Sequence, residues 1–162
     1  MSAASLPFLN STETLSTQDL ILLEGQYRTD SIVLAFERAL QQKHALTEAE
    51  RVVLAVEAVE REVSNGGFSQ FLLNSSRSYA YFAPKALQLI EAIETAELCS
   101  KALAIVTAGR QLDELELRVA AADLDEDSEE LLSELDSAFY ASQDGSLSEK
   151  LFEYIKINRG QI

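Results

Sequence analysis

Apolar residues recur along this chain at the spacing of α-helices, and no segment shows the strict alternation of a half-buried strand. Val52, Val56, Val59 and Val63 fall at positions i, i+4, i+7 and i+11, which places them on one face of a helix. A later run, residues 101–108, is apolar on nearly every side and predicts the most buried helix. The pattern predicts an all-α fold, a single compact domain of seven or eight helices.

Capping residues predict where several helices begin. In a capping box, a Ser or Thr and an acidic residue three positions later each accept a hydrogen bond from the other's backbone N–H. This spacing occurs in three places: Ser16 with Asp19, Thr47 with Glu50, and Ser146 with Glu149. Thr95 is expected to cap a further helix. We expect a flexible N-terminal tail over residues 1–15 and one helical domain over residues 16–162.

The second half of the chain predicts further helices. A helix is expected from Tyr79 to about Ile93, with Leu89 and Ile93 facing the core, after a loop at Ser75–Ser78. Apolar positions at helical spacing predict two more buried faces: Leu112, Leu115, Val119 and Ala122 in one helix, and Leu131, Leu132, Leu135, Ala138 and Phe139 in the next.

Composition changes this picture mainly through charge. The 162 residues are 47% hydrophobic and 25% charged, but 27 acidic residues face only 13 basic ones, for a net charge of −14. This balance disfavours direct binding of nucleic acid or of an anionic membrane, both of which require basic surfaces. One cysteine cannot form an internal disulfide, and no signal peptide or membrane-spanning run is evident, so a cytoplasmic location is expected.

Most of the charge lies in residues 113–136, where eleven acids and one base, Arg118, give a net charge of −10 (1 − 11). Clustered like charges repel one another, so a compensating role is expected. We consider this segment the candidate partner-binding surface. Its acids are Asp113, Glu114, Glu116, Asp123, Asp125, Glu126, Asp127, Glu129, Glu130, Glu134 and Asp136.

Three interpretations of the acidic segment compete. It can be a solvated surface that keeps the protein soluble. It can hold calcium, because four of its acids have the spacing of ligands in an EF-hand loop: Asp123, Asp125, Asp127 and Glu134. Ser128 and Glu130 depart from that pattern, since the loop requires a glycine and an apolar residue at these positions.

The third interpretation is imitation of a polyanion. If wholly helical, 24 residues span about 36 Å, so eleven carboxylates give one charge per about 3.3 Å. A DNA strand carries one phosphate per about 3.4 Å of axis. A break in the helix is expected near Asp123–Asp127. The density suffices to compete for a basic DNA-binding surface.

A glycine motif is the most specific local sequence. A helix is expected to end at residues 65–67, where glycine can adopt the left-handed conformation, and a short helical piece from Phe68 to about Asn74 should follow. Phe68 and Phe71 are expected to anchor the turn in the core. Gln70 and Asn74, at i, i+4, can hydrogen-bond to each other or to backbone groups freed at the turn. The motif residues are Glu62, Asn65, Gly66, Gly67, Phe68, Gln70, Phe71 and Asn74.

This string resembles the E-V-x-N-G-G-F-x-Q-[FY]-x-x-N signature of a bacterial domain family of largely unknown function, whose characterised member is an acidic DNA mimic. The resemblance extends over about Thr47 to Asn158. It includes Leu135-Asp136, Phe139-Tyr140 and Tyr154-Ile155, while Glu91 replaces a glycine of the pattern. It implies an all-helical domain and, for the characterised member, a DNA-like surface that occupies the DNA-binding region of a transcription factor.

The sequence contains no motif that points to enzymatic function. His44 has no nucleophile tied to it by a motif, Cys99 lies in an apolar helix, and Glu57 is expected to pair with Arg61 at i, i+4. Three carboxylates could include an acid/base pair: Glu57, Glu60 and Glu62. No Glu-x-x-His motif for a di-metal site occurs. We therefore expect no catalysis and no cofactor.

The preferred hypothesis is a DNA mimic that offers residues 113–136 to a basic DNA-binding protein, such as a transcription factor. The alternatives are a helical protein-interaction module whose acids serve solubility, and an EF-hand-like calcium loop at residues 123–134. The sequence leaves a homodimer open.

Overall fold

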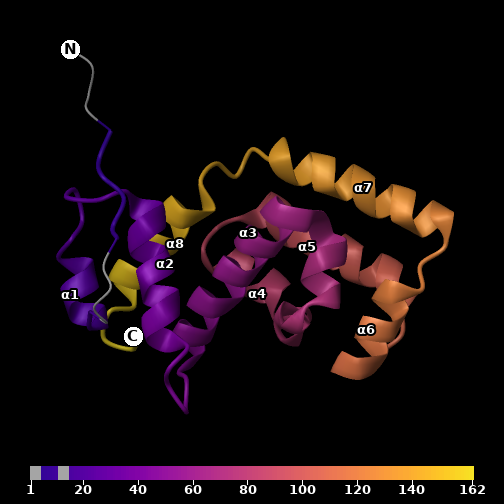
Figure 1. The fold of residues 1–162 in the computed structure, drawn as a ribbon, viewed down its shortest axis with the longest axis horizontal. Helices are drawn as coiled ribbons and strands as arrows, with labels where there is room; N and C mark the ends of the chain where they lie inside the picture. Colours follow the sequence, from indigo (N-terminus) through magenta and orange to yellow (C-terminus); the bar gives the residue numbers. More distant parts are fainter. Residues whose placement is uncertain (1–4, 11–14) are drawn as a thin grey trace.

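The computed structural model describes residues 5–10 and 15–162, and within these ranges it contains eight α-helices, one 3-10 helix and no strand, which confirms the all-α prediction (Figure 1). In chain order the elements are α1 (Thr17–Ile21), α2 (Thr29–Leu40), α3 (Glu48–Leu73), η1 (Ser75–Tyr79), α4 (Ala83–Leu89), α5 (Ile93–Thr107), α6 (Glu114–Ala122), α7 (Glu126–Tyr140) and α8 (Leu147–Ile157).

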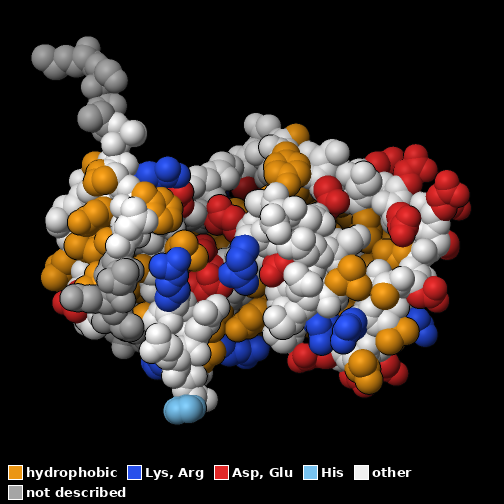
Figure 2. All heavy atoms as spheres, viewed as in Figure 1, with side chains coloured by type: hydrophobic (Ala, Val, Ile, Leu, Met, Phe, Trp, Pro, Cys, Tyr) orange, Lys and Arg blue, Asp and Glu red, His pale blue; other side chains and the backbone are white. Residues whose placement is uncertain are grey.

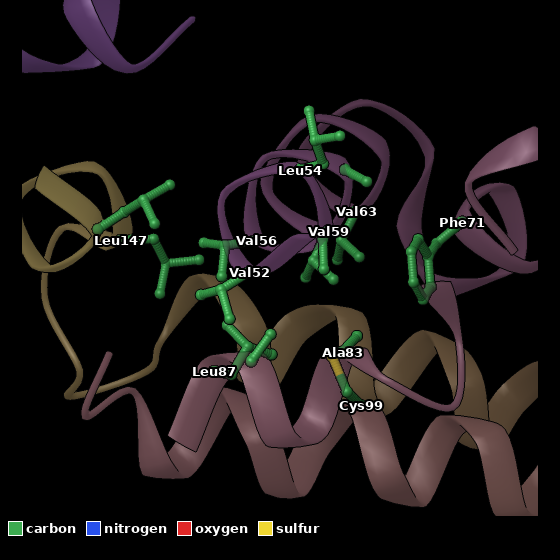
Figure 3. Packing of buried hydrophobic residues seen from close by; sticks show 14 of the residues in the cluster. Val52, Leu54, Val56, Val59, Val63, Phe71, Ala83, Leu87, Cys99 and Leu147 are labelled. Atoms are coloured by element: carbon green, nitrogen blue, oxygen red, sulfur yellow. The ribbon is translucent and has the colours of Figure 1, made fainter. Parts of the chain in front are cut away.

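Helix α3 is the centre of the fold. It contacts α2, η1, α4, α5, α6, α7 and α8, and every residue from Val52 to Val59 is buried. The predicted valine stripe is confirmed: its four side chains are fully buried and face α4 and α5 in Figure 3, where Leu87 and Cys99 lie opposite. The prediction that residues 101–108 form the most buried helix is wrong, because Lys101 and Ala104 of α5 are exposed.

Two of the three predicted capping boxes are confirmed, those that begin at Ser16 and Thr47. At the third, the Ser146 hydroxyl accepts from the Glu149 backbone N–H, but the return bond is not formed. In all three places a short polar side chain satisfies an N–H that has no partner within its helix.

The expectation that Thr95 caps a helix is wrong. Helix α5 begins two residues earlier, and a residue distant in sequence serves as its cap. The Asp144 carboxylate accepts from the Thr95 backbone N–H at 2.6 Å, from the Thr95 hydroxyl at 2.7 Å and from the Glu94 N–H at 3.3 Å. Although burial acts to raise the pKa of Asp144, these hydrogen bonds hold it below its usual value.

The predicted helix from Tyr79 to Ile93 is shorter than expected. Ser75–Tyr79, expected mostly as a loop, forms η1; α4 begins at Ala83, with Pro84 in its first turn, where a proline costs no hydrogen bond. Leu89 and Ile93 are exposed instead of facing the core.

Two further predicted faces are wrong in part. In α6, Leu117 and Ala121 are buried, while Leu115 and Val119, which were expected inside, are exposed by 66% and 59%. Ala122 is exposed as well, and in α7 so is Leu131. Helix α6 presents apolar residues at helical spacing on two sides, so periodicity alone cannot choose its buried side, whereas the predicted apolar residues of α7 lie on one side.

Part of the expected N-terminal tail contacts α2. Leu9 is buried and its backbone N–H donates to the Ser31 hydroxyl at 3.0 Å, while the Pro7 carbonyl accepts from the Arg28 N–H at 2.9 Å. Residues 1–4 and 11–14 of that expected tail lie outside the described residues.

Glu91 ends α4 in a conformation that favours glycine. The Glu91 N–H donates to the Gln88 carbonyl and the Ala92 N–H to the Leu87 carbonyl, which is the Schellman pattern of a helix end. Glu91 has a φ of 62° there, so its Cβ is crowded by the backbone. This is the position where the family pattern has glycine.

We therefore predict that Glu91→Gly raises the free energy of unfolding by about 0.5–1 kcal/mol, the relief of strain less the added entropy of the unfolded chain. Urea unfolding measures the change. The control is Gln88→Gly, at an exposed position within α4, which should lower stability by about 1 kcal/mol. A loss of stability in both variants would contradict the prediction.

A carboxylic acid is buried within α3. Glu57 is 7% exposed, and its Oε1 has no hydrogen-bond partner in the described part of the chain. Burial raises the pKa of Glu57 to about 8, with smaller contributions from Glu60 and Glu37. The expected Glu57–Arg61 ion pair is wrong, because the Arg61 guanidinium pairs with Glu37.

Glu57 should make stability depend on pH. In the unfolded chain it loses its proton near pH 4.5, whereas the folded protein retains it up to about pH 8. The free energy of unfolding should therefore fall as pH rises between these values, by about 1.4 kcal/mol for each unit over which the two states differ. Glu57→Gln should remove most of this loss, so that the variant is the more stable protein at pH 8.5 and close to wild type at pH 4.5.

Urea unfolding at several pH values tests this prediction, with Glu97→Gln, at an exposed position of α5, as the control. If the free energy of unfolding changed with pH in the same way in wild type and in Glu57→Gln, Glu57 would not be the cause of the pH dependence.

Candidate functional site

The glycine motif interrupts α3. Gly66 has φ −151° and ψ 18°, and Gly67 has φ 76° and ψ −176°, so the chain leaves the helical conformation for two residues and re-enters it at Phe68. The expected left-handed cap is corrected: Gly67 is extended with positive φ, a region that is essentially confined to glycine. The short helical piece after the glycines is confirmed and ends at Leu73.

Glu62 joins the two sides of this break. Its Oε2 accepts from the side-chain amides of Gln70 and Asn74, each at 2.8 Å. Both expected alternatives are therefore wrong: the two amides bond neither each other nor a freed backbone group, but the same carboxylate. The Asn65 amide donates to Gln70 Oε1 at 3.4 Å. The four polar residues of the motif form one network across the break, which explains their spacing.

Side chains of α7 bond the backbone groups that the break in α3 leaves without helical partners. The Phe68 backbone N–H, freed by the glycines, donates to Asp136 Oδ1 at 2.8 Å. The Tyr140 hydroxyl donates to the carbonyl of Ser64 at 2.8 Å. The Phe68 ring meets the Phe139 ring edge-on at 6.2 Å between centroids. Thus α7 provides hydrogen-bond partners for backbone groups on both sides of the break. Phe68 and Phe71 anchor the break in the core as predicted, since their side chains are 0% and 2% exposed.

Close approach explains why both residues are glycines. A Cβ on Gly67 would lie 2.2 Å from Asp136 Oδ2, and a Cβ on Gly66 would lie 2.1 Å from Gln70 Oε1. Real Cβ atoms do not approach other atoms so closely. Gly67 therefore allows α7 to pack closely onto α3, and Gly66 leaves room for the Gln70 side chain of the polar network.

The acidic segment forms α6, α7 and their connection, as two helices rather than one continuous rod. The expected break near Asp123–Asp127 is confirmed, because α6 ends at Ala122 and α7 begins at Glu126. Red side chains gather in Figure 2 at the end of the molecule where Figure 1 places this connection, far from both chain termini.

Four of the eleven acids have local roles. Asp113 caps α6 in a capping box with Glu116, and Asp125 caps α7 by accepting from the Ser128 N–H at 2.8 Å. Hydrogen bonds from Ser128 lower the pKa of Asp125. Asp136 is half-buried against the glycine break, as described above.

The other seven acids are exposed, and the ion pairs of the described residues include none of them. They are Glu114, Asp123, Glu126, Asp127, Glu129, Glu130 and Glu134. Four of these, Glu114, Glu126, Asp127 and Glu129, occupy first turns, where a negative charge interacts favourably with the helix dipole. Asp123, Glu130 and Glu134 lie outside the first turns.

The structure does not form an EF-hand loop. Residues 126–134 are helical, so Asp127 and Glu134 lie on α7 instead of closing around a cation, and Asp125 is engaged as a cap. Among the described residues, no group of three His, Cys, Asp or Glu side chains could hold a metal ion. The calcium interpretation is wrong for this geometry.

Glu57 and Glu60 lie one turn apart on α3 and interact, but the other candidate catalytic groups do not join them. Burial raises the pKa of the Cys99 thiol to about 12, so it stays protonated and unreactive. His44 is exposed between α2 and α3. Glu60 accepts from the Ser148 hydroxyl and Glu62 belongs to the glycine network.

Sequence reasoning missed the contact between the glycine break and α7. Asp136 and Tyr140 are separated from the break by 68 and 76 residues, respectively. Asp136 was instead grouped with the partner-binding acids. The available signal was the presence of Asp136 and Tyr140 in the same family pattern as the glycines, which indicates membership but not contact.

The fold and this site define a class: an acidic, all-helical protein in which the central helix is broken at two glycines and α7 packs against the break. The model of the DMP19-like protein family matches residues 44–158, more than half of the chain, and the chain belongs to that family. No curated protein and no solved structure matches the chain. In the described part, no helix has both the length and the apolar content needed to cross a membrane.

We predict that Gly67→Ala lowers the free energy of unfolding by about 3 kcal/mol or more, because backbone strain and a clash with Asp136 add together. Chemical unfolding measures the loss. Gly25→Ala is the control for a positive φ without a close approach: Gly25 has a φ of 74° and no atom within 4 Å of its Cβ position, so its loss should be smaller. Equal losses in the two variants would contradict the role of close approach.

Proposed function

We propose that this protein is a non-catalytic DNA mimic that binds the basic surface of a DNA-binding protein through the exposed acids of α6 and α7. The observation that carries the proposal is the cluster of seven exposed carboxylates outside the ion pairs of the described residues, in a member of the DMP19-like family. Because these carboxylates are not neutralised within the described chain, they are available to cations of a partner.

The charge density on α7 supports the proposal. Five exposed carboxylates lie between Glu126 and Glu134, a helical rise of about 12 Å, which is one charge per about 3 Å. A DNA strand has one phosphate per about 3.4 Å. Glu126, Glu130 and Glu134 follow one another at i, i+4 and form a row on the solvent side of α7.

A second function is favoured by a specific observation. Seven of the eleven acids occupy N-cap or first-turn positions of α6 and α7, where acids stabilise any helix. A helical interaction module whose charge serves solubility would show the same preference. Of the other four, Asp136 bonds the glycine break, so Asp123, Glu130 and Glu134 are the acids that separate the two functions.

Charge reversal at two of these positions tests the proposal. Immobilised protein should retain a DNA-binding protein from a lysate of the source organism, and excess duplex DNA or salt should release it. Glu130→Lys with Glu134→Lys should weaken retention at least tenfold and leave the melting temperature close to wild type, because neither residue lies in a first turn.

The matched control is Glu97→Lys with Glu153→Lys, exposed positions of α5 and α8 that give the same change in net charge. Lys156 keeps its ion pair with Glu24 in that control. Retention that excess duplex DNA does not release, or an equal loss in both pairs of variants, would reject mimicry and favour the solubility function. The molar mass in solution would show whether the protein is a homodimer. A cytoplasmic location stays a prediction.

A further inference from the structure

Helix α6 has an apolar face that the fold leaves uncovered. Leu115 and Val119 are separated by one helical turn and are exposed by 66% and 59%, while Leu117 and Ala121 on the opposite side are buried. Two large exposed residues at i, i+4 form a continuous surface rather than a scattered pair. Orange side chains lie beside red ones at this end of the molecule in Figure 2.

This face forms one wall of a groove of about 560 Å³. Ile105 of α5 and Leu124 of the α6–α7 connection extend its apolar surface, and both are half-buried. The volume is within the range of about 300–1,000 Å³ that is typical of ligand clefts. The groove remains open because α7 packs against α3 and α5, whereas α6 packs against α3, α5 and η1.

The acidic residues around the groove favour a positively charged ligand. Glu116, Asp123 and Asp125 lie among its lining residues with a single base, Arg110. The surrounding residues 113–136 have a net charge of −10, so nucleic acid is repelled, and a second copy docking with the same end would face equal charge. A segment with both apolar and basic side chains is complementary to the apolar wall and to the acidic rim of the groove.

We infer that this groove receives an amphipathic, basic segment of the partner protein, with apolar side chains against Leu115 and Val119 and Lys or Arg side chains against the acidic rim. The inference rests on the proposed function and names the chemistry of the partner segment. A helix laid in a groove uses this arrangement of apolar anchors and charged edges. The apolar contact adds affinity that salt does not screen, unlike the contacts of the carboxylates alone.

Two synthetic peptides test the inference. The first is an 18-residue helical peptide of Leu and Lys, with Leu at i, i+3 and i+4 spacing, and the second has every Leu replaced by Ala at unchanged charge. Fluorescence anisotropy at 150 and 500 mM salt measures their dissociation constants. The Leu peptide should bind wild type at least tenfold more tightly than the Ala peptide, and its advantage should persist at the higher salt.

Leu115→Ser with Val119→Ser should remove this advantage, whereas Leu131→Ser with Ile157→Ser, at exposed apolar positions outside the groove, should preserve it. Equal binding of the two peptides to wild type, or an equal effect of the two pairs of variants, would overturn the inference. It would also be overturned if wild type were a dimer that Leu115→Ser with Val119→Ser converts to monomer, because a second copy would then occupy the groove.

The peptide experiment tests the groove and the duplex-DNA experiment tests mimicry, so either hypothesis can be rejected without the other. Retention that duplex DNA releases, together with no preference for the Leu peptide, leaves mimicry standing and rejects the groove. A preference for the Leu peptide without retention that duplex DNA can release rejects mimicry and leaves the groove as a site for basic amphipathic segments.

Discussion

The packing of α7 onto the glycine break of α3 is the interaction on which the C-terminal half of the structure depends. Breaking a central helix exposes backbone N–H and carbonyl groups that would be costly to bury without partners. Asp136 and Tyr140 supply those partners from successive turns of α7, at 2.8 Å each. Glycine at position 67 suits this contact because a Cβ there would lie 2.2 Å from Asp136 Oδ2, and its φ of 76° favours glycine.

The same helix presents the acids to solvent. Because Asp136, Phe139 and Tyr140 hold the C-terminal turns of α7 against α3, the N-terminal turns extend to the end of the molecule where α6 and α7 are connected. The acidic surface and the open groove therefore share one cause. The glycine motif forms this support, and the exposed residues of α6 and α7 form the surface that we propose binds a partner.

The parts of the fold that local chemistry governs could be predicted from the sequence. The valine stripe of α3 and the capping boxes at Ser16 and Thr47 depend on residues within a few positions of one another. The concentration of acids in residues 113–136 is likewise a property of the chain itself. The end of α4 was misplaced because Glu91 adopts a conformation that is rare for a residue with a Cβ.

The sequence by itself determined the all-helical class, the central helix face, the break at the glycines and the place of the charge, because each follows from helical periodicity, backbone freedom or composition. Only the tertiary structure decided which side of α6 is buried, that Asp144 caps α5 and that Asp136 belongs to the core. The Asp144 and Asp136 contacts join residues 49 and 68 positions apart, and the buried side of α6 depends on its packing against other helices. Local periodicity contains no information about such contacts. Either apolar side of α6 could face the core, and the packing of α6 against α3 and α5 buries Leu117 and leaves Leu115 exposed.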